Sequence, residues 1–140
     1  MKSLLSKIIL AAAALAASIG TTQATEWEAI ESAADVTVYI DPASIRQRDH
    51  RAEMWALIDY KNPQMDKTGK QVLSDKLLYQ FDCQAKTLAV VGSSAHAGPM
   101  ASGEIININP DPPQLTPIEA GTLAYSMWKR ACGALTAPKK

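Results

Sequence analysis

Hydrophobic and polar residues alternate along the middle of this chain with the two-residue period of a half-buried β-strand. In the clearest case, residues 52–60, the residues on one face are Ala52, Met54, Ala56, Ile58 and Tyr60. The other face carries Trp55 and Leu57, so both faces are partly apolar and the pattern indicates a central strand. The same period predicts further strands over residues 27–31, 36–40, 72–83, 87–94 and 103–109.

Turn-forming and charged residues mark the connections between these strands. Asp41-Pro42 ends the second strand, because proline has no amide hydrogen to donate to a sheet, and a single turn is expected over residues 43–45. Further predicted connections are a charged loop over residues 46–50, a long exposed loop over residues 61–71 and a flexible small-residue loop over residues 93–102.

Only the C-terminal part of the chain has the spacing of an amphipathic helix. Its apolar stripe consists of Ala124, Met127, Trp128 and Ala131. Two starting points fit this helix. Thr116 opens a capping box with proline at the first helical position, and Thr122 is the alternative cap. Gly133 is predicted to end the helix.

The first 24 residues have the layout of an export signal. Lys2 and Lys7 precede an apolar run over residues 8–19, and a tail of small and polar residues ends at Ala24, the expected cleavage site. The run is shorter than the about 18 residues that a membrane-spanning helix needs. It also lacks the cysteine that carries a lipid anchor in bacterial lipoproteins. We therefore expect a periplasmic or secreted protein with no membrane span and no lipid anchor.

The remaining chain is expected to fold as one domain over residues 25–135, followed by a flexible tail over residues 136–140. Removal of the signal leaves 140 − 24 = 116 residues, which is enough for one hydrophobic core. The predicted elements place this domain in the α+β class. We expect a single antiparallel sheet of about six strands with the C-terminal helix packed against it.

The charge balance argues against one class of partner. The full chain has 14 basic and 14 acidic residues, and loss of the two signal lysines leaves 12 basic residues and a net charge near −2. Nucleic-acid-binding domains carry a basic surplus instead. We therefore expect no nucleic-acid partner.

The chain has two cysteines, Cys83 and Cys132, which would reach an oxidising compartment together. Two cysteines allow one connectivity, so we expect an intramolecular disulfide that ties the end of the helix to the sheet. The alternative is a metal or redox site. The chain has no C-x-x-C motif, and neither His50 nor His96 has ligand-like spacing to a cysteine, so the disulfide is favoured.

No motif of a known catalytic or cofactor site occurs in the chain, and no catalytic residue, cofactor or metal is predicted. The nearest approach to a site is Ser94 and His96, a hydroxyl and an imidazole on the same side of an extended chain. The sequence supplies no recognisable carboxylate to orient the histidine. A loop histidine without a catalytic role is the commoner case.

Two groups of basic residues are candidates for binding an acidic partner. One group consists of Arg46, Arg48, His50 and Arg51. The other, which is the predicted partner-binding site, consists of Lys61, Lys67, Lys70 and Lys76. The alternative for both groups is a solvated rim that protects strand ends against aggregation. The three tryptophans, Trp27, Trp55 and Trp128, fit core packing better than a sugar-binding platform.

Four segments of the chain resemble the surface-adhesin protein E family of Gram-negative bacteria. They are Trp27, residues 38–45, residues 54–64, and residues 79–83 (Tyr-Gln-Phe-Asp-Cys) together with Cys132. The resemblance implies one antiparallel sheet of about six strands with a C-terminal helix against it. It also implies a binding role, because the family's namesake is an adhesin for host matrix and serum proteins, and it supplies no catalytic residues.

The sequence therefore favours an exported, non-enzymatic domain that binds a host matrix or envelope protein. The expected recognition surface is the loop after Tyr60 or a free sheet edge, which would also allow a homodimer. The alternatives are a small periplasmic hydrolase that uses Ser94 and His96, and a structural envelope protein.

Overall fold

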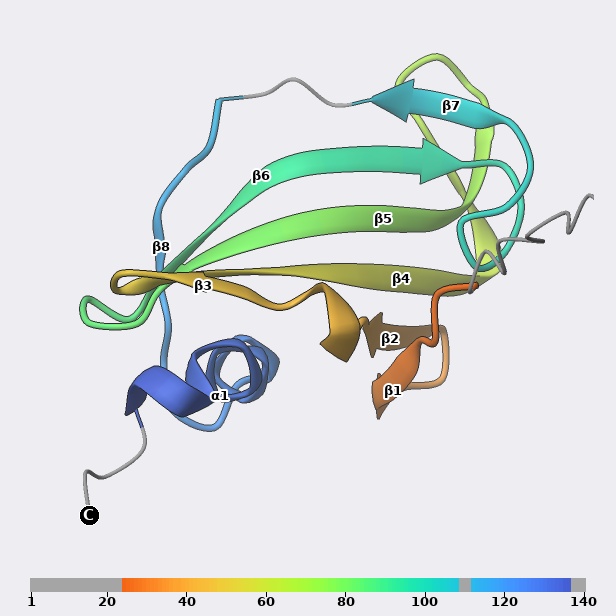
Figure 1. Cartoon of the computed structure of the whole chain (residues 1–140). Helices are drawn as coiled ribbons and strands as arrows, with labels where there is room; N and C mark the ends of the chain where they lie inside the picture. The colour runs from red at the N-terminus through yellow and green to blue at the C-terminus, as the bar shows by residue number, and fades with distance from the viewer. Residues whose placement is uncertain (1–23, 109–111, 137–140) are drawn as a thin grey trace, which may run out of the picture.

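A computed structural model describes residues 24–108 and 112–136, which form one antiparallel sheet with an α-helix on one face (Figure 1). The predicted signal segment lies, apart from Ala24, outside the described residues, and so do residues 137–140 of the predicted tail. The strands are β1 (Glu28–Ser32), β2 (Val36–Ile40), β3 (Arg46–Arg48), β4 (Arg51–Met65), β5 (Gln71–Asp82), β6 (Thr87–His96), β7 (Ile105–Ile108) and β8 (Thr116–Pro117). The helices are the 3-10 turn η1 (Pro42–Ser44) and α1 (Leu123–Thr136). Within the described part of the chain, no helix is long and apolar enough to cross a membrane.

Six strands lie side by side in the order β1-β2-β4-β5-β6-β7, while β3 pairs with β4 and β8 pairs with β6. The α+β prediction is confirmed, but the predicted number of strands was too low, since the sheet has eight. The two missed strands have three and two residues. Such short segments show no measurable alternation, and β3 consists of charged and polar residues that were predicted to be a loop.

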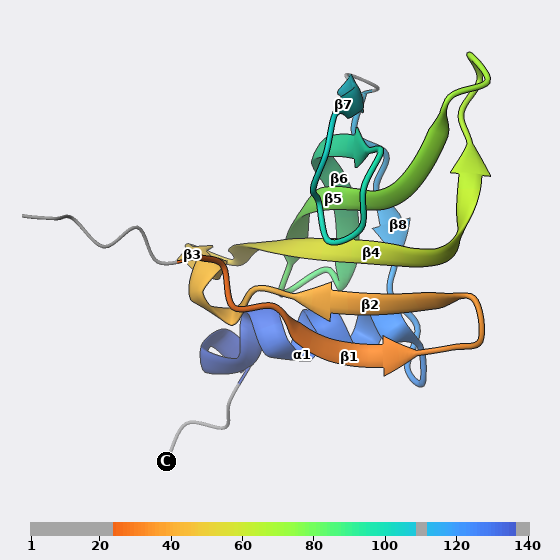
Figure 2. The same ribbon diagram turned by 90° about the vertical axis from the view of Figure 1, so that its right-hand side faces the viewer.

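Parts of two predicted loops are strand. Residues 61–65 continue β4, and Gln64 and Met65 pair with Val72 and Gln71 of β5, so that only residues 66–70 form a turn. This hairpin extends beyond the rest of the sheet (Figure 2). In the same way, β6 continues to His96, so Ser94 and His96 are strand residues and not part of a flexible loop.

The hydrophobic core lies between α1 and one face of the sheet. The sheet contributes Ile40, Ala52, Met54, Ala56 and Phe81, and the helix contributes Met127, Trp128 and Ala131. The predicted apolar stripe of the helix therefore faces the sheet. Ala124, its remaining member, is only partly buried against this core.

Helix α1 begins at the second of the two predicted caps. The Thr122 hydroxyl accepts a hydrogen bond from the Tyr125 amide at 3.2 Å, and Gly121 adopts a positive φ of 80° just before it. Thr116 and Pro117 belong to β8 instead, so the capping box is wrong. The predicted end is also wrong, because the helix runs through Gly133 to Thr136. A single glycine costs a helix only about 1 kcal/mol relative to alanine and does not end it unaided.

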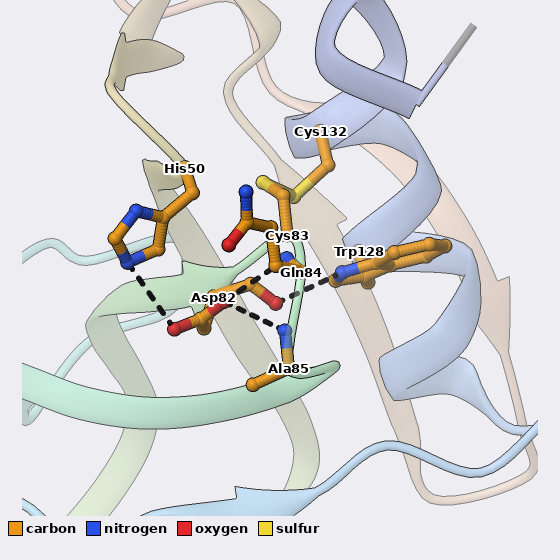
Figure 3. Close-up of polar contacts among 7 residues, drawn as sticks. All are labelled: His50, Asp82, Cys83, Gln84, Ala85, Trp128 and Cys132. Carbon is orange, nitrogen blue, oxygen red and sulfur yellow. Dashed lines mark hydrogen bonds and ion pairs between the residues drawn. A yellow bond between two sulfur atoms is a disulfide. The ribbon is translucent and has the colours of Figure 1, made fainter. Parts of the chain in front are cut away.

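The predicted disulfide joins Cys83, just after β5, to Cys132 in α1, with their Cα atoms 5.7 Å apart (Figure 3). A hydrogen bond from the Trp128 indole to the Asp82 carbonyl, at 3.3 Å, adds a second tie between helix and sheet. The helix is therefore held at this corner by both a covalent and a polar contact.

Replacing both cysteines by serine is expected to lower the free energy of unfolding by about 2–5 kcal/mol. The disulfide spans 49 residues of sequence, and its loss frees that segment in the unfolded chain. Urea unfolding of the oxidised protein and the double variant measures the difference, and hydrogen exchange should show the amides of α1 opening first. Equal stability of the two proteins would contradict this role of the disulfide.

Candidate functional site

The hairpin formed by the ends of β4 and β5, residues 61–71, projects from the sheet and is called the arm here (Figure 2). The pairing of β4 with β5 changes register between Asp59 and Gln64. Pro63, which has no amide hydrogen, lies inside this interval, where no pairing needs one. The side chains of residues 61–65 are all exposed. The arm therefore presents most of its surface to solvent.

The tip of the arm is held by one aspartate. One carboxylate oxygen of Asp66 accepts hydrogen bonds from the amides of Thr68 at 2.8 Å and Lys70 at 2.9 Å, and from the Thr68 hydroxyl at 2.7 Å. Gly69 supplies the positive φ of 81° that the turn needs. The hydrogen bond from the Thr68 side chain, followed by that from the Lys70 amide, holds the pKa of Asp66 below its usual value. These contacts define one conformation of the tip.

The base of the arm is braced by the segment that follows β6. The amides of Met100 and Ala101 donate to the Asp59 carboxylate at 2.9 Å and to the Ser74 hydroxyl at 2.8 Å. The Ser74 hydroxyl in turn donates to the Gly98 carbonyl at 2.7 Å. Sequence reasoning missed Asp59 and Ser74, because their role depends on a segment about 25 to 40 residues away in sequence.

A second brace is the hydrogen bond from the Tyr60 hydroxyl to the Asp75 carboxylate, at 2.7 Å. Burial, together with this bond, raises the pKa of Tyr60, so the phenol stays protonated as the donor. The arm is therefore joined at its base to β5 and to the segment after β6, and it does not depend on its own pairing alone.

The structure divides the predicted lysine site. Lys67 and Lys70 lie at the exposed tip of the arm, where Lys70 is 3.9 Å from Glu104. Lys61 lies at the base of the arm and donates to the Ala33 carbonyl at 3.3 Å. Lys76 is separate from these three, because it lies on the sheet with its ammonium 4.5 Å from the centre of the Trp55 ring. Lys67 and Lys70 are therefore the two predicted lysines that lie together at the tip of the arm.

An exposed apolar side chain accompanies the lysines of the arm. Met65, which precedes the turn, has 61% of its surface exposed. A flexible apolar side chain next to two cations is suited to a protein surface that carries both acidic and apolar groups. The sequence pattern indicated the lysines as candidates but not Met65, because residues 61–71 are predicted to be an irregular loop.

The Ser94 hydroxyl and the Nε2 atom of His96 are within hydrogen-bond distance at 2.8 Å. His96 is 7% exposed, and its Nδ1 atom has no hydrogen-bond partner among the described residues. Burial, followed by the charge of Lys76, lowers the pKa of His96. The pair therefore lacks the group that orients a catalytic histidine, and the imidazole has little access to a substrate.

The remaining candidates lie elsewhere. Arg46, Arg48, His50 and Arg51 surround the turn between β3 and β4. Trp128 is buried in the core, whereas Trp27 and Trp55 are half-buried. In the described residues, no three His, Cys, Asp or Glu side chains are grouped closely enough to hold a metal ion.

Comparison with known proteins identifies the family and the fold. The family model for surface-adhesin protein E matches residues 27–133, which confirms the resemblance found in the sequence. The fold is similar to the crystal structure of protein E from non-typeable Haemophilus influenzae, with a TM-score of 0.62, 14% identity, and coverage of 83% of this chain and 82% of that chain. A second crystal form of Haemophilus influenzae protein E gives a TM-score of 0.60 at 11% identity, with coverage of 80% and 98%. No curated protein sequence matches the chain.

Replacing Ser74 by alanine is expected to destabilise the protein by about 1–3 kcal/mol, because it leaves the Gly98 carbonyl and the Ala101 amide without their partner. Urea unfolding measures the loss, and hydrogen exchange should rise in residues 97–103. Ser126→Ala, which removes an exposed hydroxyl from α1, is the matched control. An equal effect of both substitutions would show that Ser74 does not brace the arm.

His96 is expected to make the protein less stable in acid. The pKa of His96 in the folded state lies below the usual 6.5. As the pH is lowered, the unfolded chain therefore takes up a proton at this residue before the folded chain does. The free energy of unfolding should therefore decrease as the pH is lowered from about 7 to about 5. His96→Asn should remove this part of the decline. If the free energy of unfolding decreases equally with falling pH in both proteins, His96 is not the source of this acid sensitivity.

Proposed function

The chain belongs to the surface-adhesin protein E family, and from this premise we propose that it is an exported, non-enzymatic domain that binds a protein partner through the arm. The partner is a host matrix protein or an envelope protein with an acidic surface. Lys67, Lys70 and Met65 make the contact, and the rest of the domain holds them in position.

The ordered geometry of the arm is the observation that carries this proposal. The tip is closed by the Asp66 hydrogen bonds, and the base is joined to the Asp59 and Ser74 contacts. A surface that is already ordered loses little conformational entropy when it binds, so a small contact area can still give specific binding. Binding residues commonly lie on such projections from a rigid scaffold.

Export is supported by two separate features. The first 24 residues have the pattern of a cleavable signal, and the domain contains a disulfide that an oxidising compartment would maintain. We therefore place the mature domain in the periplasm or outside the cell.

Hydrolysis by Ser94 and His96 is the alternative, because their side chains do lie 2.8 Å apart. The described residues give His96 Nδ1 no partner, and most of the ring is buried. A serine hydrolase needs an oriented histidine and access to its serine. These features favour a structural role for the pair.

Changing Lys67 and Lys70 together to glutamate should weaken binding to an immobilised basement-membrane matrix extract by about tenfold or more, since each reversal removes a charge contact and adds repulsion. Binding of the purified domain is measured against concentration on the coated surface. The same assay on bacterial envelope extract distinguishes the two sources of partner.

Lys129→Glu is the matched control, because it reverses an exposed lysine on α1, away from the arm. It should bind as the wild type does. Thermal unfolding checks the folding of both variants, and loss of the exposed Lys70–Glu104 pair should cost no more than about 1 kcal/mol. If the arm variant binds both extracts as well as the wild type, the arm is not the binding site.

A further inference from the structure

The turn between β3 and β4 forms a second cationic surface, at the opposite end of the sheet from the arm (Figure 1). A groove of about 430 Å³ lies along it. Its lining includes Arg46, Arg48, Arg51, Asp49, Glu53 and Gln80, and among the described residues that line it Ala52 is the only aliphatic one. The groove is therefore lined almost entirely by residues with polar or charged end groups.

Arg48 and Arg51 face each other directly across the two strands. Like charges in this position destabilise a sheet, so the pairing opposes folding. Among the described residues, no carboxylate lies within 4.0 Å of either guanidinium group. Both side chains are exposed. The pair is therefore a local conflict without a close ion pair, although Asp82 lies opposite Arg51 on β5, and such conflicts occur where a protein binds something.

The nearby carboxylates are already engaged. Glu53 accepts a hydrogen bond from the Gln80 amide at 3.2 Å. Asp82, opposite Arg51 on β5, accepts from the amides of Gln84 and Ala85 at 3.0 and 2.8 Å and lies 3.6 Å from His50 (Figure 3). Arg46 differs from the other two arginines, because it donates to the carbonyls of Ala43 and Ile45.

The turn is fixed in position by contacts on both sides. The Gln47 side chain donates to the Ala131 carbonyl of α1 at 2.8 Å, and the Cys83 amide donates to the His50 carbonyl at 2.7 Å. Cys83 is also held by the disulfide (Figure 3). The two arginines are therefore attached to a backbone that needs no reorganisation to receive an anion.

We propose that Arg48 and Arg51 form an anion clamp that binds the sulfate groups of a sulfated polysaccharide. The planar guanidinium group donates paired hydrogen bonds to oxyanions, and an anion between the two arginines would remove their repulsion. A polysaccharide fits better than a peptide, because the centre of a protein interface needs large apolar or aromatic anchors and no such side chain lines this groove. The clamp is independent of the arm.

The test is titration of the full mature domain with a sulfated heparin-derived hexasaccharide. The wild type should bind it, and added salt should weaken binding by screening. Arg48→Ala and Arg51→Ala should each lower affinity about tenfold. Asp49→Asn should raise affinity up to about fivefold, since it removes a negative charge from the groove. Asparagine tolerates the positive φ of 54° at this position.

Two controls test whether the arginine variants lose binding through misfolding and whether the arm contributes to binding of the hexasaccharide. Without ligand, Arg48→Ala should be at least as stable as the wild type, because it removes a like-charge contact. The Lys67→Glu/Lys70→Glu variant should bind the hexasaccharide as the wild type does, even if the arm has no partner.

Three results would overturn the clamp. These are wild-type affinity in the Arg48→Ala/Arg51→Ala double variant, equal binding of the desulfated hexasaccharide, and weaker binding by Asp49→Asn. Tighter binding of a polyglutamate peptide than of the hexasaccharide, lost in the same arginine variants, would replace the sulfated polysaccharide with an acidic protein segment.

Discussion

The contact between α1 and one face of the sheet is the interaction on which the rest of this structure depends. It buries the main hydrophobic core, and the Cys83–Cys132 disulfide together with the Trp128–Asp82 hydrogen bond holds it at one corner. A domain of this size has one core, so the sheet must be stabilised from this side. Among the residues that the structure describes, no α-helix covers the opposite face or either end of the sheet, and both candidate binding surfaces lie at these ends.

The arm and the arginine groove depend on that core in different ways. The groove lies close to the disulfide, so α1 and the end of β5 fix its geometry directly. The arm lies far from the helix, and local contacts of Asp66, Asp59 and Ser74 hold it instead. A change that loosens the helix should therefore disturb the groove before it disturbs the arm.

Much of this fold could be predicted from the sequence, because its long strands and its helix have clear periods. The strand conformation of residues 61–65 could not be predicted, because Pro63 normally argues against a strand. Here Pro63 lies at a register shift where no amide hydrogen is needed, and that shift is set by the pairing of β4 with β5. The candidate lysines were found by their charge alone. That Lys76 lies on the sheet with Trp55, apart from the arm lysines, depends on strand register, which local pattern does not determine.

Local contacts at its tip and base hold the arm in an ordered position that projects from the sheet. Backbone 15N relaxation of the free domain measures this order. Order parameters of about 0.85 are expected for residues 64–72, equal to those of the sheet, including the turn that Asp66 closes. Order parameters below about 0.6 throughout the arm would show instead that the lysines lie on a flexible loop.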